Sequence, residues 1–273
     1  MREKFHFQHL ITYSSESNTL VLNIDMGQYW EFMNIDKRQG SGHLGNLGEL
    51  FFTTRTSDSL IYLLAVPAIP LKLINTSSNG SVVAGAWAGD RIICLGDYAY
   101  TWPGGPRVND AHFLQTASHV ASPQTFSESC TNFRSVNCGY ERQVSYPNDG
   151  VWALRNLSKK LYVRSDGIPT INDENNLTYE AHDGLQGFPN LGHALLANIV
   201  WSDDSSTSMR FRDVQGSWAG DRIDVRLMDD VAEEIQEGWK DISRQEAVTL
   251  YNIFVEEEEV DGDFPEEPKA PLE

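Results

Sequence analysis

The pattern of apolar and polar positions predicts mainly strands joined by tight turns. Glycine and aspartate residues such as Gly89 and Asp90, placed between two apolar runs, are typical of β-hairpin turns. Residues 151–163 predict one or two further strands, whereas 47–52 and 191–199 fit either a helix or a strand. The predicted hairpins pair 20–24 with 29–35, 81–87 with 91–95, and 209–218 with 222–227.

The last part of the chain predicts a helix and then an acidic tail. Four apolar residues follow one another at helical spacing, and Asp229 and Asp230 precede them as suits a helix N-terminus. These residues are Val231, Ile235, Trp239 and Ile242. The apolar segment 250–255 either extends this helix or forms a last strand. From residue 256 onward the acidic composition predicts a disordered tail.

Two motifs occur twice in the same order. Residues 85–92 (GAWAGDRI) recur as 216–223 (GSWAGDRI), identical at seven of eight positions and 131 residues apart. Residues 30–38 (WEFMNIDKR) align with 152–160 (WALRNLSKK), 122 residues apart. Two motifs that recur in the same order with nearly the same spacing predict an internal duplication.

The predicted fold class is therefore α+β, with two internally duplicated, mainly antiparallel-sheet modules. The stretch between the modules is rich in Ser, Asn, Pro and Gly, which predicts a long polar loop or linker. The predicted divisions are a first module over 1–100, the linker over 101–150, a second module over 151–228, an amphipathic helix or strand over 229–255, and the acidic tail over 256–273.

The duplicated motifs resemble a group of uncharacterised fungal proteins, some of them described as F-box-like. Phrases such as residues 85–91 and 152–160 recur in that group, and the resemblance covers residues 20–260. It implies no particular activity and brings no catalytic residues with it.

The net charge of the 273-residue chain is −18. Residues 229–273 hold 16 acidic and 3 basic residues, and so contribute −13 of it. We therefore expect no nucleic-acid partner and no membrane-surface partner. The apolar stretch 60–74 is too short to span a bilayer and is broken by Pro67 and Pro70. With no apolar signal core at the N-terminus, we expect a cytoplasmic or nuclear protein.

The duplicated turn motifs hold the candidate ligand-binding residues. An Asp and an Arg beside a Trp can hold a ligand through charge-assisted hydrogen bonds and stacking. The alternative interpretation is structural, since a turn needs Gly and Asp, and a Trp anchors a sheet to its core. The candidates are Trp87, Asp90, Arg91, Trp218, Asp221 and Arg222, and to these we add His119. A cationic set that could receive the acidic tail or an acidic partner is Lys37, Arg38, Lys159, Lys160 and Arg164.

Other site chemistry is weak in this sequence. The possible ligand set His112, His119, Cys130 and Cys138 has wider spacing than structural zinc sites use. The chain has no phosphate-binding loop, dinucleotide-binding glycine motif or nucleophile elbow. We therefore expect no metal and no cofactor, and the catalytic residues, if any, are unknown.

These observations favour an intracellular protein-interaction or adaptor protein built from two related modules, with a protein partner. Its seven Trp and ten Tyr residues suit an interface. One alternative is an enzyme with a small-molecule site between the modules, covered by the 101–150 loop. Another is a carbohydrate-binding module that uses exposed Trp and Asp residues. The oligomeric state stays open.

Overall fold

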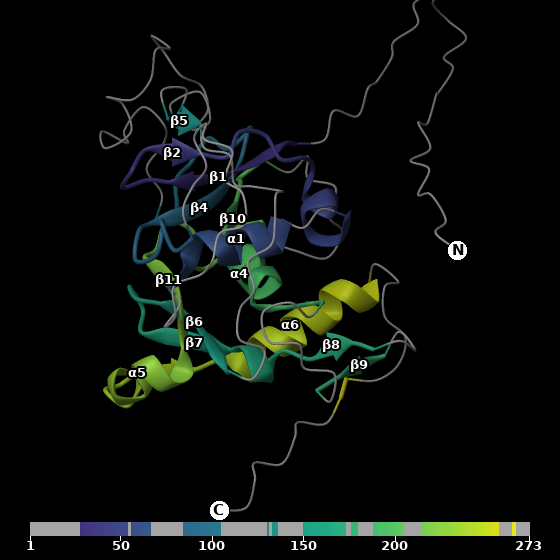
Figure 1. Ribbon diagram of the computed structural model, residues 1–273. Helices are drawn as coiled ribbons and strands as arrows, with labels where there is room; N and C mark the ends of the chain where they lie inside the picture. The colour runs from purple at the N-terminus through teal and green to yellow at the C-terminus, as the bar shows by residue number, and fades with distance from the viewer. Residues whose placement is uncertain are drawn as a thin grey trace, which may run out of the picture.

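The structure is a computed structural model. It describes residues 28–53, 56–66, 84–104, 130, 133–135, 150–172, 176–179, 188–204, 214–256 and 264–265. These residues form helices and three sheets, two with five strands each and one with two. The α+β class is confirmed. In Figure 1 the two larger sheets lie one above the other, with helices between them.

The first sheet has the strand order β10-β4-β1-β2-β5. Its longest pairing is antiparallel, between β1 and β4, while β10 adds to β4 and β5 adds to β2 in parallel. The sheet is therefore mixed, and not wholly antiparallel. Its strands are β1 (Trp30–Asn34), β2 (Gln39–Gly40), β4 (Ile92–Gly96), β5 (Arg134–Ser135) and β10 (Val200–Trp201).

The second sheet has the order β12-β7-β6-β11-β3 and the same mixture of pairings. Strand β6 is antiparallel to β11 and β7, whereas β3 and β12 add in parallel at the edges. Its strands are β3 (Ala65–Val66), β6 (Trp152–Asn156), β7 (Leu161–Arg164), β11 (Ile223–Leu227) and β12 (Lys240–Asp241). The two-stranded sheet consists of β8 (Thr170–Ile171) and β9 (Leu177–Thr178).

The helices pack between and beside the sheets. Helix α1 (Thr56–Leu64) lies beside α4 (Leu191–Ile199) in the space between the sheets (Figure 1). Helix α5 (Met228–Ile235) packs on β11, and α6 (Ser243–Glu256) packs on α4 and β7. A π-helical turn, η1, spans Glu49–Thr53, and a 3₁₀ turn, η3, spans Ser165–Gly167.

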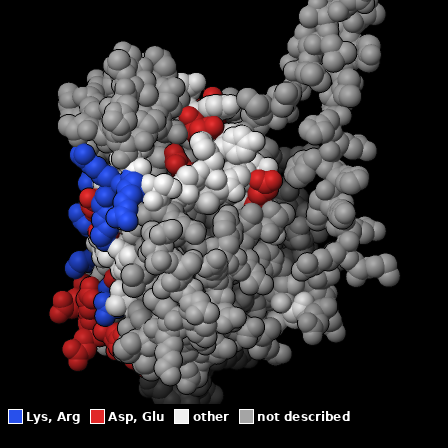
Figure 2. All heavy atoms as spheres, turned by 45° about the horizontal axis from the view of Figure 1, so that its top comes forward, with Lys and Arg blue, Asp and Glu red and all other residues white. Residues whose placement is uncertain are grey.

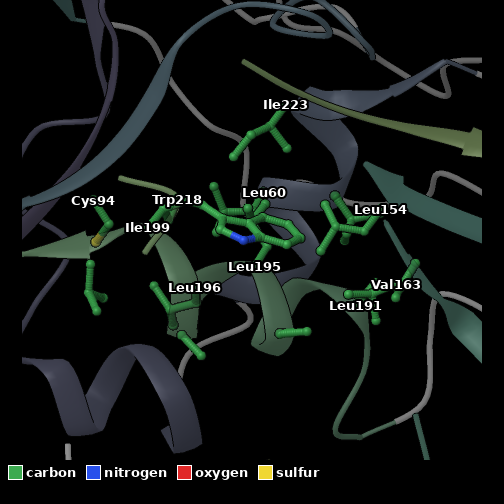
Figure 3. Packing of buried hydrophobic residues seen from close by; sticks show 14 of the residues in the cluster. Leu60, Cys94, Leu154, Val163, Leu191, Leu195, Leu196, Ile199, Trp218 and Ile223 are labelled. Carbon is green, nitrogen blue, oxygen red and sulfur yellow. The ribbon is translucent and has the colours of Figure 1, made fainter. Parts of the chain in front are cut away.

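Each sheet contains a strand from the other predicted module. Strand β3 directly follows α1 in the first module, yet pairs with β11 of the second. Strand β10 directly follows α4 in the second module, yet pairs with β4 of the first. Because of this exchange, one apolar core contains residues of both modules. Figure 3 shows Trp218 in that core beside Leu60, Leu154 and Leu195.

The hairpins predicted at 81–95 and 209–227 are wrong. Residues 84–90 and 217–220 form turns, and β4 and β11 pair with β1 and β6. The N–H of Trp87 donates to Leu63 O at the end of α1, and that of Trp218 donates to Asn198 O near the end of α4. The helix ends thus take the hydrogen bonds that the predicted hairpins needed.

Other predicted elements have mixed outcomes. Strand β1 confirms the strand at 29–35, while 20–24 lies outside the described residues. Strands β6 and β7 confirm the prediction for 151–163, and 191–199 is helical. The 231–242 helix is wrong beyond Ile235, where α5 ends, because the chain turns at Gly238 (φ 82°).

Two segments that the sequence predicted as irregular have ordered parts. Strand β5 lies within the predicted linker and pairs with β2. In the predicted tail, the Phe264 ring contacts the Tyr251 ring of α6, with the ring centres 5.4 Å apart. Apart from Glu256, Phe264 and Pro265, the tail lies outside the described residues. Over the residues that the structure describes, no helix is both long enough and apolar enough to cross a membrane.

Candidate binding surface

The turn after β1 is organised by one buried asparagine. Asn34 is fully buried, and its Oδ1 accepts a hydrogen bond from the backbone N–H of Lys37 at 2.8 Å. Its Nδ2 donates to Oδ2 of Asp90 at 2.8 Å. The side chain therefore joins the β1 turn to the GAWAGDRI turn. The next residue, Arg38, has a φ of 50°, which ends this tight turn.

The turn after β6 has the same organisation. Asn156 is fully buried, and its Oδ1 accepts from the N–H of Lys159 at 3.0 Å. Its Nδ2 donates to Oδ2 of Asp221 at 2.8 Å, and Lys160 has a φ of 52°. Every described contact of Asn34 therefore has a counterpart 122 residues later. Asparagine is uncommon in strands, and here it links two turns at each strand end.

Two lysines complete these networks. Lys37 Nζ lies 2.5 Å from Asp90 Oδ2 and also donates to Ala86 O. Lys159 Nζ lies 2.7 Å from Asp221 Oδ2 and also donates to Ser217 O. Each lysine thus neutralises the aspartate of one turn motif and satisfies a backbone carbonyl within it.

The two candidate tryptophans are buried. Trp87 is 0% exposed, and its Nε1 donates to Oε1 of Gln39 at 2.7 Å. Trp218 is 1% exposed and lies in the apolar core (Figure 3). Neither ring has a face for a ligand, so their assignment as ligand-binding residues is wrong. Burial of a large aromatic side chain in each turn fits the structural interpretation.

The two turn motifs meet directly through their backbones. Gly89 N donates to Ile223 O at 2.8 Å, and Gly220 N donates to Ile92 O at 2.9 Å. Arg91 and Arg222 form an antiparallel bridge between them. Backbone hydrogen bonds therefore occupy the junction at which the enzyme alternative places its ligand. We call the surface formed here by residues 36–38, 89–91, 158–160 and 220–222 the central seam.

Both arginines of the motif bind one carboxylate, Asp36. Arg91 Nε lies 2.7 Å from Asp36 Oδ1, and its backbone N–H donates to Oδ2 at 3.0 Å. Arg222 Nη1 donates to Asp36 Oδ2 at 2.9 Å and to Gly89 O at 3.0 Å. Burial raises the pKa of Asp36, but these hydrogen bonds and the two positive charges outweigh it and lower the pKa overall.

The second module has no carboxylate at the position of Asp36. Ser158 occupies that position, and its Oγ accepts from the backbone N–H of Arg222 at 3.0 Å. Arg222 therefore turns toward the carboxylate of the first module. The sequence analysis did not select Asp36 as a site residue. The difference between Asp36 and Ser158 in the two aligned segments was the signal that could have identified it.

The central seam is exposed and cationic. Between 41% and 50% of the side-chain surface is exposed for four of its cations: Arg91 (41%), Lys37 (43%), Lys159 (45%) and Arg222 (50%). Arg38 and Lys160 at the turn tips are exposed, and so is Arg134 of the adjoining β5. Among the described residues here, these seven cations face three carboxylates, those of Asp36, Asp90 and Asp221. Figure 2 shows Lys and Arg side chains gathered along one side of the molecule.

The remaining candidates do not join the seam. His119, like His112 and Cys138, lies outside the described residues. Cys130 is described; its thiol is free and buried, and burial raises its pKa. Within the described ranges, no group of three His, Cys, Asp or Glu side chains is arranged to hold a metal ion.

Comparisons with known proteins add no relative to this picture. No protein-family model, no curated protein and no solved structure matches the chain.

Proposed function

We propose that this chain is an intracellular protein-interaction or adaptor protein built from two related modules, and that the central seam is its binding surface. One observation carries the proposal: a chain with a net charge of −18 gathers an excess of cations on one exposed surface. Cations placed together repel one another, and an anionic partner relieves that cost.

The paired networks support the relation between the modules. The contacts of Asn34, Lys37 and Asp90 recur at Asn156, Lys159 and Asp221, with the same atoms as donors and acceptors. We attribute this to the internal duplication that the sequence predicts and to the resemblance to the fungal group. The seam then belongs to both modules, since each supplies one of its arginines.

The internal contacts leave binding capacity unused. The two lysines are engaged by the turn motifs, but the arginines are engaged only in part. Arg91 Nη1, Arg222 Nε and Arg222 Nη2 make no hydrogen bond to any described residue. A guanidinium carries five N–H donors in a planar fork that suits carboxylates, so these atoms can hold a partner.

The two alternative functions have less support. The enzyme alternative relies on Asp90 and Asp221, and each of these carboxylates already binds an asparagine and a lysine. The carbohydrate alternative relies on exposed tryptophans, and Trp87 and Trp218 are buried.

The test compares two variants that change the net charge equally. Arg91→Gln with Arg222→Gln removes two charges from the seam, and Lys240→Glu removes two at an exposed residue of β12. Each tagged protein is expressed in the source cells, and co-purified proteins are measured by quantitative mass spectrometry. We expect a stoichiometric partner with the wild type and with Lys240→Glu, and its loss from the double Gln variant. An equal set of partners for both variants would contradict the proposal.

A further inference from the structure

The arrangement of charge on the seam indicates what kind of partner binds there. Resting on the proposed function above, we propose that the seam binds a short acidic segment of a partner protein, in which several Asp or Glu carboxylates follow one another. Charge-assisted hydrogen bonds to carboxylates are what exposed, partly engaged guanidinium groups form most strongly.

The seam suits several carboxylates along a segment better than one isolated anion. Asp36 already occupies the point where Arg91 and Arg222 converge. The remaining cations lie on both sides of that point. Lys37, Arg38 and Arg134 belong to the β1–β2–β5 side, and Lys159 and Lys160 belong to the turn between β6 and β7. A ligand must therefore carry charges that reach both sides of the central pair.

The neighbouring helix limits the length of the ligand. Lys160 Nζ donates to Glu237 O just after α5, so the end of that helix borders the seam. Exposed carboxylates follow along this helix and its end: Asp229, Asp230, Glu233, Glu234 and Glu237. Figure 2 shows a group of acidic side chains directly beside the cations. A long polyanion such as a nucleic acid would meet these carboxylates, whereas a short segment stays on the seam.

The partly satisfied arginines are positioned before any partner arrives. Arg222 is held by Asp36 and Gly89 O, and Arg91 is held by two contacts to Asp36. Long side chains normally lose rotamer freedom when they bind. Because these two are already oriented, a bound carboxylate costs less entropy than it would on free surface arginines.

The probe is a fluorescein-labelled decapeptide of alternating Glu and Asp, with a decapeptide of alternating Gln and Asn as its neutral match. Binding to the full chain is followed by fluorescence anisotropy at low and at physiological ionic strength. We expect the acidic peptide to bind and the neutral peptide not to bind. Affinity should fall at least tenfold in Arg91→Gln with Arg222→Gln, fall with added salt, and stay unchanged in Lys240→Glu.

Ser158→Asp provides a second variant, in case the double Gln variant does not fold. It places a carboxylate at the Ser158 position, beside Arg222, as Asp36 is placed in the other module. We expect weaker binding of the acidic peptide with an unchanged thermal unfolding temperature. Equal binding to wild type and Ser158→Asp would overturn the inference, and so would equal or tighter binding of a ten-base-pair DNA duplex.

The acidic run Glu256–Glu259 of the chain itself is the competing occupant, and replacing its four Glu by Gln tests it. If the acidic peptide binds only after that replacement, the seam holds its own chain's acidic run, and the proposal of a partner segment is overturned. If the acidic peptide binds to neither form while the double Gln variant still loses its co-purified partners, the acidic-segment inference fails and the interaction function stands. If the partners are unaffected, the proposed function itself fails.

Discussion

The outer faces of the two large sheets differ most at one matched pair of positions. In the first sheet Met33 of β1 stands opposite Ile93 of β4. In the second sheet Arg155 of β6 stands opposite Asp224 of β11. All four residues are buried, and each first member directly precedes the turn asparagine of its module. The same backbone pairing thus holds an apolar pair in one sheet and an ion pair in the other.

The covering elements explain this difference. Met33 and Ile93 pack in an apolar cluster with Leu95, Ala99 and Trp102. The second sheet is covered instead by α5 and the turn after it. Arg155 donates to Asp224 at 2.7 and 2.8 Å and to Glu234 of α5 at 2.7 Å, and its guanidinium lies 5.2 Å from the centre of the Trp239 ring. A pairing position therefore accepts either chemistry, provided that the element packed over it supplies matching partners.

Conversion of the second sheet to the apolar pair should give the largest effect. Arg155→Met alone leaves the buried Asp224 carboxylate without its cation, so we expect a loss of about 3–5 kcal/mol in the free energy of unfolding. Arg155→Met with Asp224→Ile removes both charges, and we expect it to lie within about 1 kcal/mol of wild type. Urea unfolding of the three proteins measures this difference. A double variant as unstable as the single one would show that the positions are not interchangeable.

A buried histidine distinguishes α4 from α1, the other helix between the sheets. His193 Nδ1 accepts from the backbone N–H of Asn190 at 3.1 Å, in a capping box at the start of α4. Burial lowers the pKa of His193 to about 4, although a backbone hydrogen bond involving Phe51 acts to raise it. A proton on Nδ1 would remove the acceptor that the cap needs, so the folded state keeps the ring neutral.

Acid should therefore destabilise the fold through His193. The unfolded histidine takes up a proton below about pH 6.5 and the folded one only near pH 4, so stability present above pH 6.5 is lost as the pH falls between these values. We expect a loss of about 2 kcal/mol between pH 7.5 and pH 5 from this group. His193→Gln retains a capping acceptor and should lack that part of the loss. An equal pH dependence of urea unfolding in both proteins would contradict this assignment.

The two turn asparagines should respond alike to substitution. Asn34→Ala and Asn156→Ala each remove one bond to an aspartate and one from a lysine N–H, all at a fully buried side chain. We expect each to cost about 2 kcal/mol, with a difference between them below about 0.5 kcal/mol. Thermal and urea unfolding measure both values. A large difference would show that the two networks, despite matching atoms, carry unequal loads.

Much of the local structure was readable from residue order. The strands of β1, β6 and β7 follow from apolar runs, and the turn motifs follow from glycine and aspartate. The predicted hairpins failed because residues before the turns bond to the ends of α1 and α4, which lie far away in sequence. Among the site candidates, Asp90, Arg91, Asp221 and Arg222 do lie together. Asp36 was missed, since its importance depends on an arginine 186 residues away.

The sequence by itself determined where the chain turns and which side chains are apolar enough to be buried, because these properties depend on each residue and its near neighbours. It also determined that two turn motifs occur. The tertiary structure alone decided that the strands after α1 and α4 exchange between the sheets, and that both motifs meet at one seam. Strand pairing and charge pairing depend on contacts between distant segments, and only the packed fold brings those segments together.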